Sequence, residues 1–340
     1  MSAATPRWIG DLSAADLDAA ISLLRQVITD QSTVVIAAHV APDGDTLGAA
    51  LALHLALSAE GVDTRPTVGE RPLKVPAALS VLPGVEDLVG GKLPDASEVA
   101  LLITVDAASP DRLGSVVGYL DAQVPTLVLD HHSSGTVYGD LRLVAPRAGA
   151  AVMIVALLLD ELGMELTRDI AACLYAGLVT DTGRFGHAKT DGSAMRLGAR
   201  LLEAGVDHAD LNRRLFDKRS LGQLRLLGRA LDRVEYVAEV ALVHTYLTAE
   251  ELARAASGLE AVEPLVDMLH TVDIAEVALV LKPAPEGGWR VSMRSRGGVD
   301  VGVIATRFGG GGHVDSAGFA SDQDGDAIVT AVVAALRASN

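Results

Sequence analysis

The sequence has 340 residues, enough for two domains that each bury an apolar core. Its 28 basic and 44 acidic residues give a formal net charge of −16, which argues against broad binding to nucleic acid through phosphate contacts alone. A short anionic substrate could still be held by metal ions and a few arginines. The longest uncharged stretches, 46–59 and 148–159, are shorter than the ~18 apolar residues of a membrane span. We therefore predict no contact with a membrane.

Cysteine and the N-terminal residues indicate the compartment. The single cysteine, Cys173, lies in an apolar run, which excludes an intrachain disulfide and is typical of a packing residue in a reducing compartment. Aspartates at positions 11, 16 and 18 do not fit a secretory signal. We expect a soluble cytoplasmic protein.

The first part of the chain is predicted to be a parallel α/β domain. Residues 13–29 repeat apolar positions at helical spacing. Residues 34–38 are apolar and rich in β-branched side chains, which is typical of a buried parallel strand, and residues 46–59 are typical of a helix. Further strands are expected at 99–105 and 126–129, with helices rich in alanine and leucine between them. In such sheets, ligands bind at the carboxyl ends of the strands.

The second part of the chain is predicted to be a smaller α/β domain. The arginine-rich segment before it has a helical pattern, and we interpret it as a solvated helical connector. Beyond it, three segments alternate like strands and a fourth is typical of a closing helix: 234–246, 274–282, 289–294 and 324–337. The predicted boundaries are 1–195 for the first domain, 196–233 for the connector and 234–340 for the second domain.

Five short segments carry aspartate or histidine beside a strand-like apolar run: 39–45, Asp106, 130–132, Asp181 and 309–313. A site for two divalent cations about 3.5–4 Å apart needs several carboxylate and imidazole ligands, with at least one carboxylate shared between the ions. Those ligands must converge from several strand ends. Side chains that are scattered in sequence but follow strands satisfy this requirement.

The segment 39–45, His-Val-Ala-Pro-Asp-Gly-Asp, places three potential ligands in seven residues. Asp43 and Asp45 stand two apart around Gly44, so both carboxylates can face one cavity. We expect His39 and Asp43 to face one ion and Asp45 to face the other. The alternative is an ordinary Pro-Asp-Gly-Asp turn, which is common in loops.

Acids and imidazoles also end the later strands. Asp-His-His at 130–132 directly follows the strand at 126–129, and such a cluster is hard to explain as packing. Asp106 ends another apolar strand, where a buried acid without a partner would cost several kcal/mol. A metal ion would offset that cost. Asp181 closes an apolar segment before Thr-Gly-Arg, and by itself it could also be a helix cap or helix end.

The combination of His-x-x-Pro-Asp-Gly-Asp, a strand-end Asp, Asp-His-His and a later Asp-Thr-Gly resembles the DHH phosphoesterase superfamily. The resemblance implies two bound metal ions, most often Mn²⁺, with Mg²⁺ or Co²⁺ as alternatives. The implied ligands are His39, Asp43, Asp45, Asp106, His131 and Asp181. It also implies that Asp106 bridges the ions, that His132 faces the substrate phosphate, and that Asp130 orients a neighbouring imidazole.

In the second part, four glycines at 309–312 precede His313, and Ala-Gly follows at 317–318. A backbone with almost no side chains can approach a phosphate or nucleotide closely and offer amide N–H groups. Arg-Ser-Arg at 294–296, one strand earlier, adds donors that suit phosphate oxygens. The alternative is a flexible surface loop, but we favour binding. The expected substrate-binding residues are Arg184, Arg294, Ser295, Gly311, Gly312 and His313.

The pairing of Ser-x-Arg-Ser with Gly-Gly-Gly-His resembles the DHHA1 domain of the nanoRNase or oligoribonuclease A type, so the likeness extends from about Val34 to Gly318. It implies two domains that face each other across a cleft, and a homodimer. Members cleave very short RNA (nanoRNA), dephosphorylate 3′-phosphoadenosine 5′-phosphate (pAp), and in some lineages hydrolyse cyclic di-AMP or its linear product pApA. Two departures, Ala49 in place of serine and Ser316 in place of alanine, bear on substrate preference rather than on activity.

The resemblance implies hydrolysis of a phosphate ester by water, with the ions supplying a nucleophile near neutral pH. Arg294, His132 and His313 would stabilise charge on the phosphate, and His132 or water would protonate the departing ribose oxygen. The expected substrates are short RNA, pAp, pApA or cyclic di-AMP, and not long duplexes.

Three other functions fit the sequence less well. A regulator that binds cyclic di-AMP without turnover would tolerate loss of a metal ligand, and here the set is complete. A processive single-strand exonuclease usually has extra domains and a more basic groove. A pyrophosphatase of related type carries a different, lysine-rich signature in its second domain. Catalysis on short nucleotides is therefore the favoured hypothesis.

Overall fold

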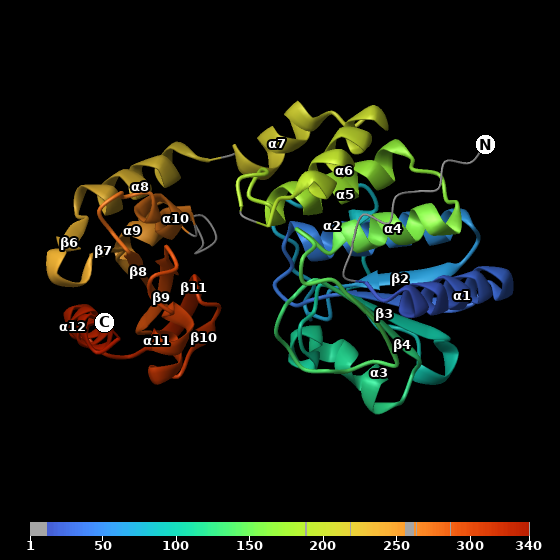
Figure 1. The fold of residues 1–340 in the computed structure, drawn as a ribbon, viewed down its shortest axis with the longest axis horizontal. Helices are drawn as coiled ribbons and strands as arrows, with labels where there is room; N and C mark the ends of the chain where they lie inside the picture. The colour runs from blue at the N-terminus through green and yellow to red at the C-terminus, as the bar shows by residue number, and fades with distance from the viewer. Residues whose placement is uncertain are drawn as a thin grey trace. The chain divides into compact units, whose positions relative to one another are not determined.

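The computed structural model describes residues 12–187, 189–217, 219–255, 262, 264–285 and 287–339. The pattern of contacts between residues divides the chain into two compact units, Met1–Lys218 and Arg219–Asn340. Each unit has its own sheet and its own apolar core, and Figure 1 follows the chain through both from blue to red.

Within the described residues, the first unit holds a five-stranded sheet in the order β2-β1-β3-β4-β5, and all its strands are parallel. The strands are β1 (Thr33–Ala38), β2 (Asp63–Thr67), β3 (Leu101–Val105), β4 (Thr126–Asp130) and β5 (Leu141–Val144). β3 and β4 are buried along their whole length, as in parallel sheets that are covered on both faces. The predicted parallel α/β fold is confirmed. Because the strands are parallel, their carboxyl ends meet at one edge of the sheet.

The sequence does not predict the two edge strands of this sheet. β2 contains Pro66 and polar residues, and proline is tolerated within sheets at an edge strand. β5 has four residues and is only partly buried. Neither strand therefore has the continuous apolar run of a central parallel strand.

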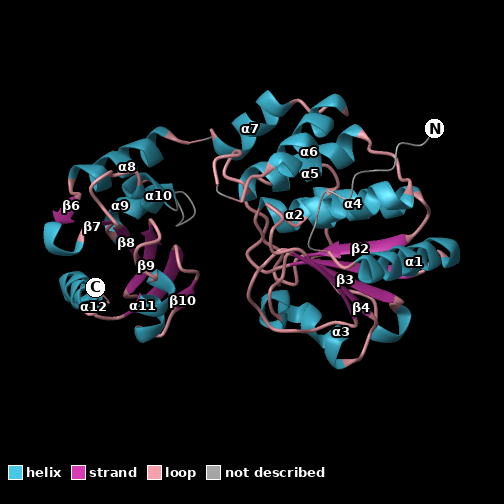
Figure 2. Cartoon of the chain, in the orientation of Figure 1, coloured by secondary structure: helices cyan, strands magenta, loops and turns pink. Residues whose placement is uncertain are grey.

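Helices cover both faces of the first sheet (Figure 2). The α-helices are α1 (Ala14–Asp30), α2 (Gly44–Ala59), α3 (Val117–Asp121), α4 (Val152–Leu162), α5 (Arg168–Asp181), α6 (Gly192–Glu203) and α7 (His208–Phe216). Short 3₁₀ helices lie in the connections: η1 (Val85–Asp87), η2 (Ala96–Glu98) and η3 (Pro110–Val116). One face of β1, including Ile36, packs in the larger core with α1, α2, α4 and α5. The other face, including Val35, packs with η3 and α3.

Helices α2 and α5 lie against each other with little space between their backbones. A Cβ at Gly48 would lie 2.4 Å from the carbonyl oxygen of Cys173. A Cβ at Gly177 would lie 2.4 Å from Cγ1 of Val152 and 2.9 Å from Oδ1 of Asp45. Glycine is therefore required at both positions. The close contact brings the start of α2 beside the end of α5.

Across its described residues, the second unit holds a six-stranded mixed sheet in the order β10-β11-β9-β8-β7-β6. The strands are β6 (Glu235–Val237), β7 (Leu242–Tyr246), β8 (Val277–Pro283), β9 (Trp289–Ser295), β10 (Gly311–Gly312) and β11 (Ser316–Ser321). β7 and β8 are parallel, and the other neighbours are antiparallel. The second α/β domain predicted from the sequence is confirmed.

Two layers of helices cover the second sheet. The elements are α8 (Leu221–Asp232), η4 (Ala238–Val240), α9 (Ala249–Arg254), α10 (Pro264–His270), α11 (Val301–Arg307) and α12 (Gly325–Arg337). Leu279 of β8 faces the core formed with α11 and α12, whereas Val280 faces the core formed with α8 and α10. In neither unit does the described chain contain a helix that is both long and apolar enough to cross a membrane.

The segment 196–233, predicted to be a solvated connector, divides between the two units. Leu197 and Leu201 of α6 are buried in the core of the first unit. Leu226 and Leu227 of α8 are buried in the second unit. The contacts between residues place the division between the two units after α7. The predicted ends of the connector, at 196 and 233, stay predictions.

Gly48→Ala is expected to lower the free energy of unfolding by about 1–3 kcal/mol, because the added methyl group overlaps the Cys173 carbonyl oxygen. Urea unfolding followed by circular dichroism would measure the change. Gly118→Ala in α3 is the matched control, since a Cβ there meets no atom within 4 Å and alanine favours a helix. Equal stability of the two variants would contradict the close packing of α2 and α5.

Candidate metal centre

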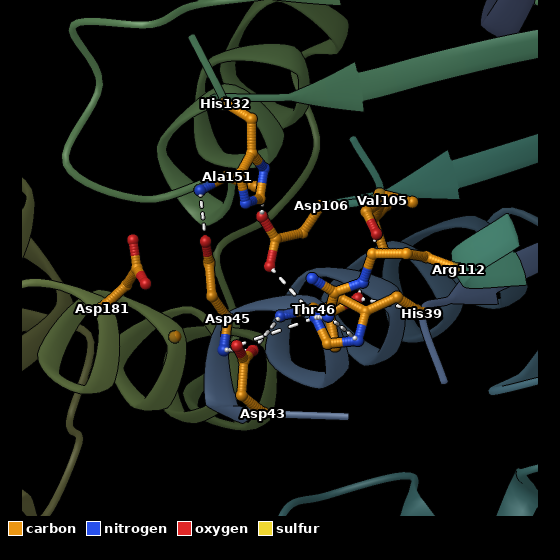
Figure 3. A network of polar contacts seen from close by, with 12 residues as sticks. His39, Asp43, Asp45, Thr46, Val105, Asp106, Arg112, His132, Ala151 and Asp181 are labelled. Atoms are coloured by element: carbon orange, nitrogen blue, oxygen red, sulfur yellow. Dashed lines mark hydrogen bonds and ion pairs between the residues drawn. The ribbon is translucent and has the colours of Figure 1, made fainter. Parts of the chain in front are cut away.

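The acids and histidines of the first unit that the sequence singles out lie together near the carboxyl edge of its sheet, and Figure 3 labels several of them. His39 directly follows β1, Asp106 directly follows β3, and Asp-His-His at 130–132 begins with the last residue of β4. Asp181 is instead the last residue of the helix α5, so the prediction of a strand-like run before this ligand is wrong. Three groups of potential ligand atoms lie within 4.8 Å of one another: His39, Asp43 and Asp106; Asp45, His131 and Asp181; Asp106, His131 and His132. We call these residues together the candidate centre.

The loop between β1 and α2 turns His39 and Asp43 toward each other. Asp43 is the N-cap of α2, and its Oδ1 accepts two backbone hydrogen bonds from the first turn, at 3.0 and 3.1 Å. Nδ1 of His39 donates to the carbonyl oxygen of Val40 at 2.8 Å, so Nε2 is the nitrogen left to act as a ligand. That Nε2 lies 3.7 Å from Oδ2 of Asp43 and 3.6 Å from Oδ2 of Asp106.

Asp45 is buried and is held by the start of α4. Its Oδ2 accepts from the N–H of Ala151 at 2.6 Å, and its Oδ1 accepts from the N–H of Val152 at 3.0 Å. Burial, followed by repulsion from Asp106 and Asp181, raises the pKa of Asp45 well above its usual value. Bringing these carboxylates together therefore costs free energy, and a nearby cation would offset that cost.

Asp106 lies between the groups of ligands. Its backbone is left-handed, with φ 55°, which is uncommon for a residue other than glycine, and its N–H donates to the carbonyl oxygen of Leu129 at 2.8 Å. Oδ2 faces His39, while Oδ1 lies 3.3 Å from Nε2 of His131 and 3.5 Å from Nδ1 of His132. Among the described residues, this buried Oδ1 has no hydrogen-bond donor. A metal ion beside it would satisfy the oxygen.

The two buried histidines are arranged alike. Nδ1 of His131 donates to the carbonyl oxygen of Ala148 at 3.1 Å, and its Nε2 lies 3.3 Å from Oδ2 of Asp181 and 3.7 Å from Oδ2 of Asp45. Burial by itself lowers the pKa of His131, but the surrounding carboxylates raise it to about 10. The same opposition between burial and two carboxylate partners raises the pKa of His39 to about 9. Burial raises the pKa of Asp181 to about 6.

Asp130 lies behind this cluster and contacts His132. Its Oδ1 accepts from Nδ1 of His132 at 2.7 Å and from the backbone N–H groups of His131 and His132 at 2.8 and 3.2 Å. Burial acts to raise the pKa of Asp130, but the hydrogen bond from His132 holds it below its usual range. This arrangement suits the predicted role of Asp130 in orienting an imidazole, which stays a prediction.

Tyr138, in the loop that follows His132, fastens the turn at Asp106. Its hydroxyl donates to the carbonyl oxygen of Ala107 at 2.7 Å and lies 3.0 Å from the hydroxyl of Thr104. Sequence reasoning misses this tyrosine, because an isolated aromatic residue in a polar loop gives no sign of its partners. The hydrogen bond holds the backbone next to Asp106 in place.

Arg112, in η3, is a second residue that sequence reasoning misses. Its Nη2 lies 3.1 Å from Nδ1 and 3.2 Å from Nε2 of His39, and Figure 3 shows its side chain beside that ring. Its carbonyl oxygen accepts from the N–H of Val40 at 2.8 Å. In the sequence, the surrounding Ser-Pro-Asp-Arg indicates only the start of a helix.

The predicted substrate-binding residues of the second unit lie on β9 and the hairpin formed by β10 and β11. Arg294 donates from Nε to Oδ1 of Asp267 at 2.8 Å and from Nη1 to Oγ of Ser316 at 2.6 Å. Ser295 is buried, and its hydroxyl donates to Oε1 of Glu276 at 3.2 Å. Ser295 therefore supports the sheet from inside, while Arg294 is partly exposed.

The glycines at the hairpin differ in whether the surrounding atoms leave room for a side chain. Gly310 and Gly312 are needed for packing, since a Cβ at either would lie 2.1 or 2.4 Å from a carbonyl oxygen of β11. A Cβ at Gly311 would meet no atom within 4 Å. Gly311, Gly312 and His313 are all exposed. The backbone at Gly311 is therefore open to close approach by another molecule.

Arg184, predicted to bind substrate, follows the end of α5 and is exposed. Its backbone has φ 56°, and its guanidinium carbon lies 4.4 Å from the centroid of the Phe216 ring. The contact of Arg184 with substrate stays a prediction.

Comparisons with known proteins place both parts of the chain in known families. The model of the DHH family, N-terminal domain, matches residues 33–178, and the model of the DHHA1 domain matches residues 241–338. A relative from Thermus thermophilus, named bifunctional oligoribonuclease and PAP phosphatase NrnA, is 35% identical over 290 residues. The alignment covers 85% of this chain and 84% of that relative.

Two solved structures are similar in fold. An exopolyphosphatase-related protein from Bacteroides fragilis has a TM-score of 0.87 and 22% identity, over 96% of this chain and 97% of that one. RecJ from Thermus thermophilus in complex with Mn²⁺ has a TM-score of 0.53 and 16% identity, over 95% of this chain and 54% of that one. At these identities, the likeness is evidence for a shared fold.

Raising the pH is expected to destabilise the metal-free protein between about pH 7 and pH 10. The folded pKa values of His39 and His131, about 9 and about 10, lie above the ordinary 6.5. Their contribution is therefore fully present below pH 6.5 and is lost as the pH rises through the folded values. Urea unfolding in the presence of a chelator would measure it. A variant carrying both His39→Gln and His131→Gln should show a flatter profile, and a flat wild-type profile would contradict the expectation.

Tyr138→Phe is expected to lower the free energy of unfolding by about 1–3 kcal/mol and to weaken Mn²⁺ binding, because it leaves the Ala107 carbonyl oxygen without its donor and loosens the Asp106 turn. Isothermal titration calorimetry would measure the metal affinity. Tyr119→Phe is the matched control, since the Tyr119 hydroxyl donates to the carbonyl oxygen of Pro94 at 2.6 Å. An equal effect of both variants on metal affinity would argue against a specific role for Tyr138.

Proposed function

Because the chain belongs to the DHH family, with a DHH domain followed by a DHHA1 domain, we propose that it is a metal-dependent phosphoesterase that hydrolyses short nucleotides to mononucleotides. The resemblance predicted from the sequence is confirmed at the level of the family. The observation that carries the proposal is the position of Asp106, whose two carboxylate oxygens face different ligand groups. A carboxylate so placed can be shared between two ions.

The side chains of the candidate centre fit two divalent cations. His39, Asp43 and Oδ2 of Asp106 would hold one ion, and the other would be held by Asp45, Asp106, His131 and Asp181. Both histidines donate from Nδ1 to a backbone carbonyl, which leaves Nε2 for a metal. The unpaired Oδ1 of Asp106 is the atom that such an ion would satisfy.

Imidazole ligands favour transition metals, so we propose Mn²⁺ ahead of Mg²⁺ or Co²⁺. RecJ, a protein of the same fold, has been solved in complex with Mn²⁺, so that ion is the first to test. When bound, the ions would supply a water nucleophile at neutral pH and neutralise charge on the phosphate.

We assign proton transfer to His132. Asp130 holds Nδ1 of His132, so Nε2 is the ring nitrogen that can donate to a phosphate oxygen or to the departing ribose oxygen. His132 is 22% exposed, in contrast to the buried His131. That exposure suits a group that meets substrate.

Substrate binding by the second unit is proposed for Arg294, His313 and the glycine hairpin. The open backbone at Gly311 can offer N–H groups, and the Arg294 guanidinium is partly exposed. Ser295 is buried, so it would act through the strand that it supports rather than by direct contact.

The proposed substrates are short RNA and pAp, with pApA and cyclic di-AMP as chemically similar candidates. The Thermus relative, named as an oligoribonuclease and PAP phosphatase, supports the first two. The net charge of −16 disfavours long strands, because their many phosphates would be repelled. The homodimer and the cytoplasmic location stay predictions.

Nucleotide release from pApA, pAp, cyclic di-AMP and a 24-nucleotide RNA, followed by chromatography in the presence of Mn²⁺, would test the proposal. We expect AMP from the short substrates and a loss of about a thousandfold or more for Asp106→Ala, since both ions lose a ligand. Asp121→Ala, at the exposed end of α3, is the control and should retain activity.

Two outcomes would contradict the proposal in different ways. Tight binding of cyclic di-AMP without turnover of any substrate would favour a regulator. Equal turnover of pApA and the 24-nucleotide RNA would contradict the preference for short substrates.

A further inference from the structure

We propose that Arg112 is a phosphate-binding residue of the candidate centre, contacting a phosphate oxygen of the substrate through its guanidinium. The inference rests on the proposed function, because it concerns the same reaction. It adds a residue that the sequence analysis did not single out to the arginines and histidines already considered.

The backbone holds Arg112 beside the centre. Its carbonyl oxygen accepts from the N–H of Val40 at 2.8 Å, which fastens η3 to the loop that follows β1. From there, the half-buried side chain brings Nη2 to within 3.1 and 3.2 Å of the two ring nitrogens of His39. The guanidinium therefore lies against a proposed metal ligand (Figure 3).

When a metal ion is bound, His39 cannot accept a hydrogen bond from this guanidinium. Its Nδ1 already donates to the carbonyl oxygen of Val40, and its Nε2 faces the carboxylates of Asp43 and Asp106. A ring that donates from one nitrogen and binds an ion with the other has no lone pair left for a donor. In a centre that holds its ions, the N–H groups of Arg112 would need another acceptor.

Protein carboxylates do not supply that acceptor. Over the part of the chain that the structure describes, Arg112 forms no ion pair with an aspartate or glutamate. Other arginines of the first unit do so, as Arg200 pairs with Asp160 and Arg65 with Asp63. A half-buried cation without an anionic partner is costly, and an anion from solution would offset the cost.

The charges around the Arg112 guanidinium indicate which anion it would bind. The four proposed carboxylate ligands would balance the charge of two divalent cations. The fifth carboxylate nearby, Asp130, is hydrogen-bonded to His132 and to the backbone of His131 and His132 rather than to Arg112, so no carboxylate of the centre pairs with the guanidinium. A cation next to metal ions is repelled by them until an anion lies among all three. The anion that the proposed reaction brings there is the substrate phosphate, and guanidinium binds phosphate through paired N–H donors.

The orientation of His39 does not depend on Arg112. The ring is fixed by the hydrogen bond from Nδ1 to Val40, and the backbone N–H of His39 donates to the hydroxyl of Thr46 at 3.1 Å. That hydroxyl donates in turn to the carbonyl oxygen of Val105 at 2.9 Å. Loss of the guanidinium should therefore leave the metal ligand in place.

Calorimetric titration of the Mn²⁺-loaded protein with inorganic phosphate and with AMP would test the inference without turnover. For Arg112→Gln, we expect affinity for both ligands to fall about ten- to a hundredfold, as for loss of a charged hydrogen bond, with a smaller loss for Arg112→Lys. Mn²⁺ affinity, measured in a separate titration, should be unchanged or higher, because a neighbouring cation has been removed. Arg65→Gln, on the exposed edge strand β2, is the matched control and should bind phosphate like the wild type.

Failure of the inference and failure of the proposed function give different results. Wild-type hydrolysis together with unchanged phosphate and AMP affinity in Arg112→Gln would overturn the inference alone. So would a tenfold loss of Mn²⁺ affinity with unchanged phosphate affinity at saturating Mn²⁺, since Arg112 would then only position His39. Phosphate binding that depends on Arg112, without hydrolysis of any nucleotide by the wild type, would support the inference and overturn the proposed function. A wild-type protein that binds no phosphate would overturn the inference.

Discussion

Four aspartates of the first unit are held close together at the carboxyl edge of one sheet, and their mutual repulsion is the constraint on which the rest of the site depends. Burial, together with the neighbouring carboxylates, raises the pKa values of Asp45 and Asp181, and a buried Asp106 oxygen has no donor. Cations relieve such repulsion. When no cation is bound, the same carboxylates raise the pKa values of His39 and His131. The protonated imidazoles then neutralise part of the negative charge.

The fold resists this repulsion through contacts at some distance from the ligands. Two N–H groups at the start of α4 bind Asp45, and the Tyr138 hydroxyl holds the turn that carries Asp106. Glycines on α2 and α5 let the two helices pack closely. As a result, the carboxylates of Asp45 and Asp181 both lie near Nε2 of His131. Ligands fixed in this way lose little freedom when an ion binds, which is the physical basis of a preorganised centre.

Local positive charge within an acidic protein would favour a short substrate over a long one, as the proposed function requires. The net charge of −16 opposes a long phosphate backbone, while Arg112 and Arg294 place guanidinium groups at defined points of the two units. The exposed backbone at Gly311 adds N–H donors without side-chain bulk. Such a distribution favours ligands with few phosphates over extended strands.

The sequence by itself determined the elements whose signal is local. The central strands β1, β3 and β4 follow from continuous apolar runs. Candidate ligands such as His39, Asp106 and His131 follow from their places just after those runs. Only the tertiary structure revealed the edge strands β2 and β5, the division of 196–233 between the units, the left-handed backbone of Asp106, and the positions of Tyr138 and Arg112. Arg112 lies 73 positions from His39 in the chain. An apolar pattern reports that a residue is buried, but the partner that it meets is decided by how distant segments pack.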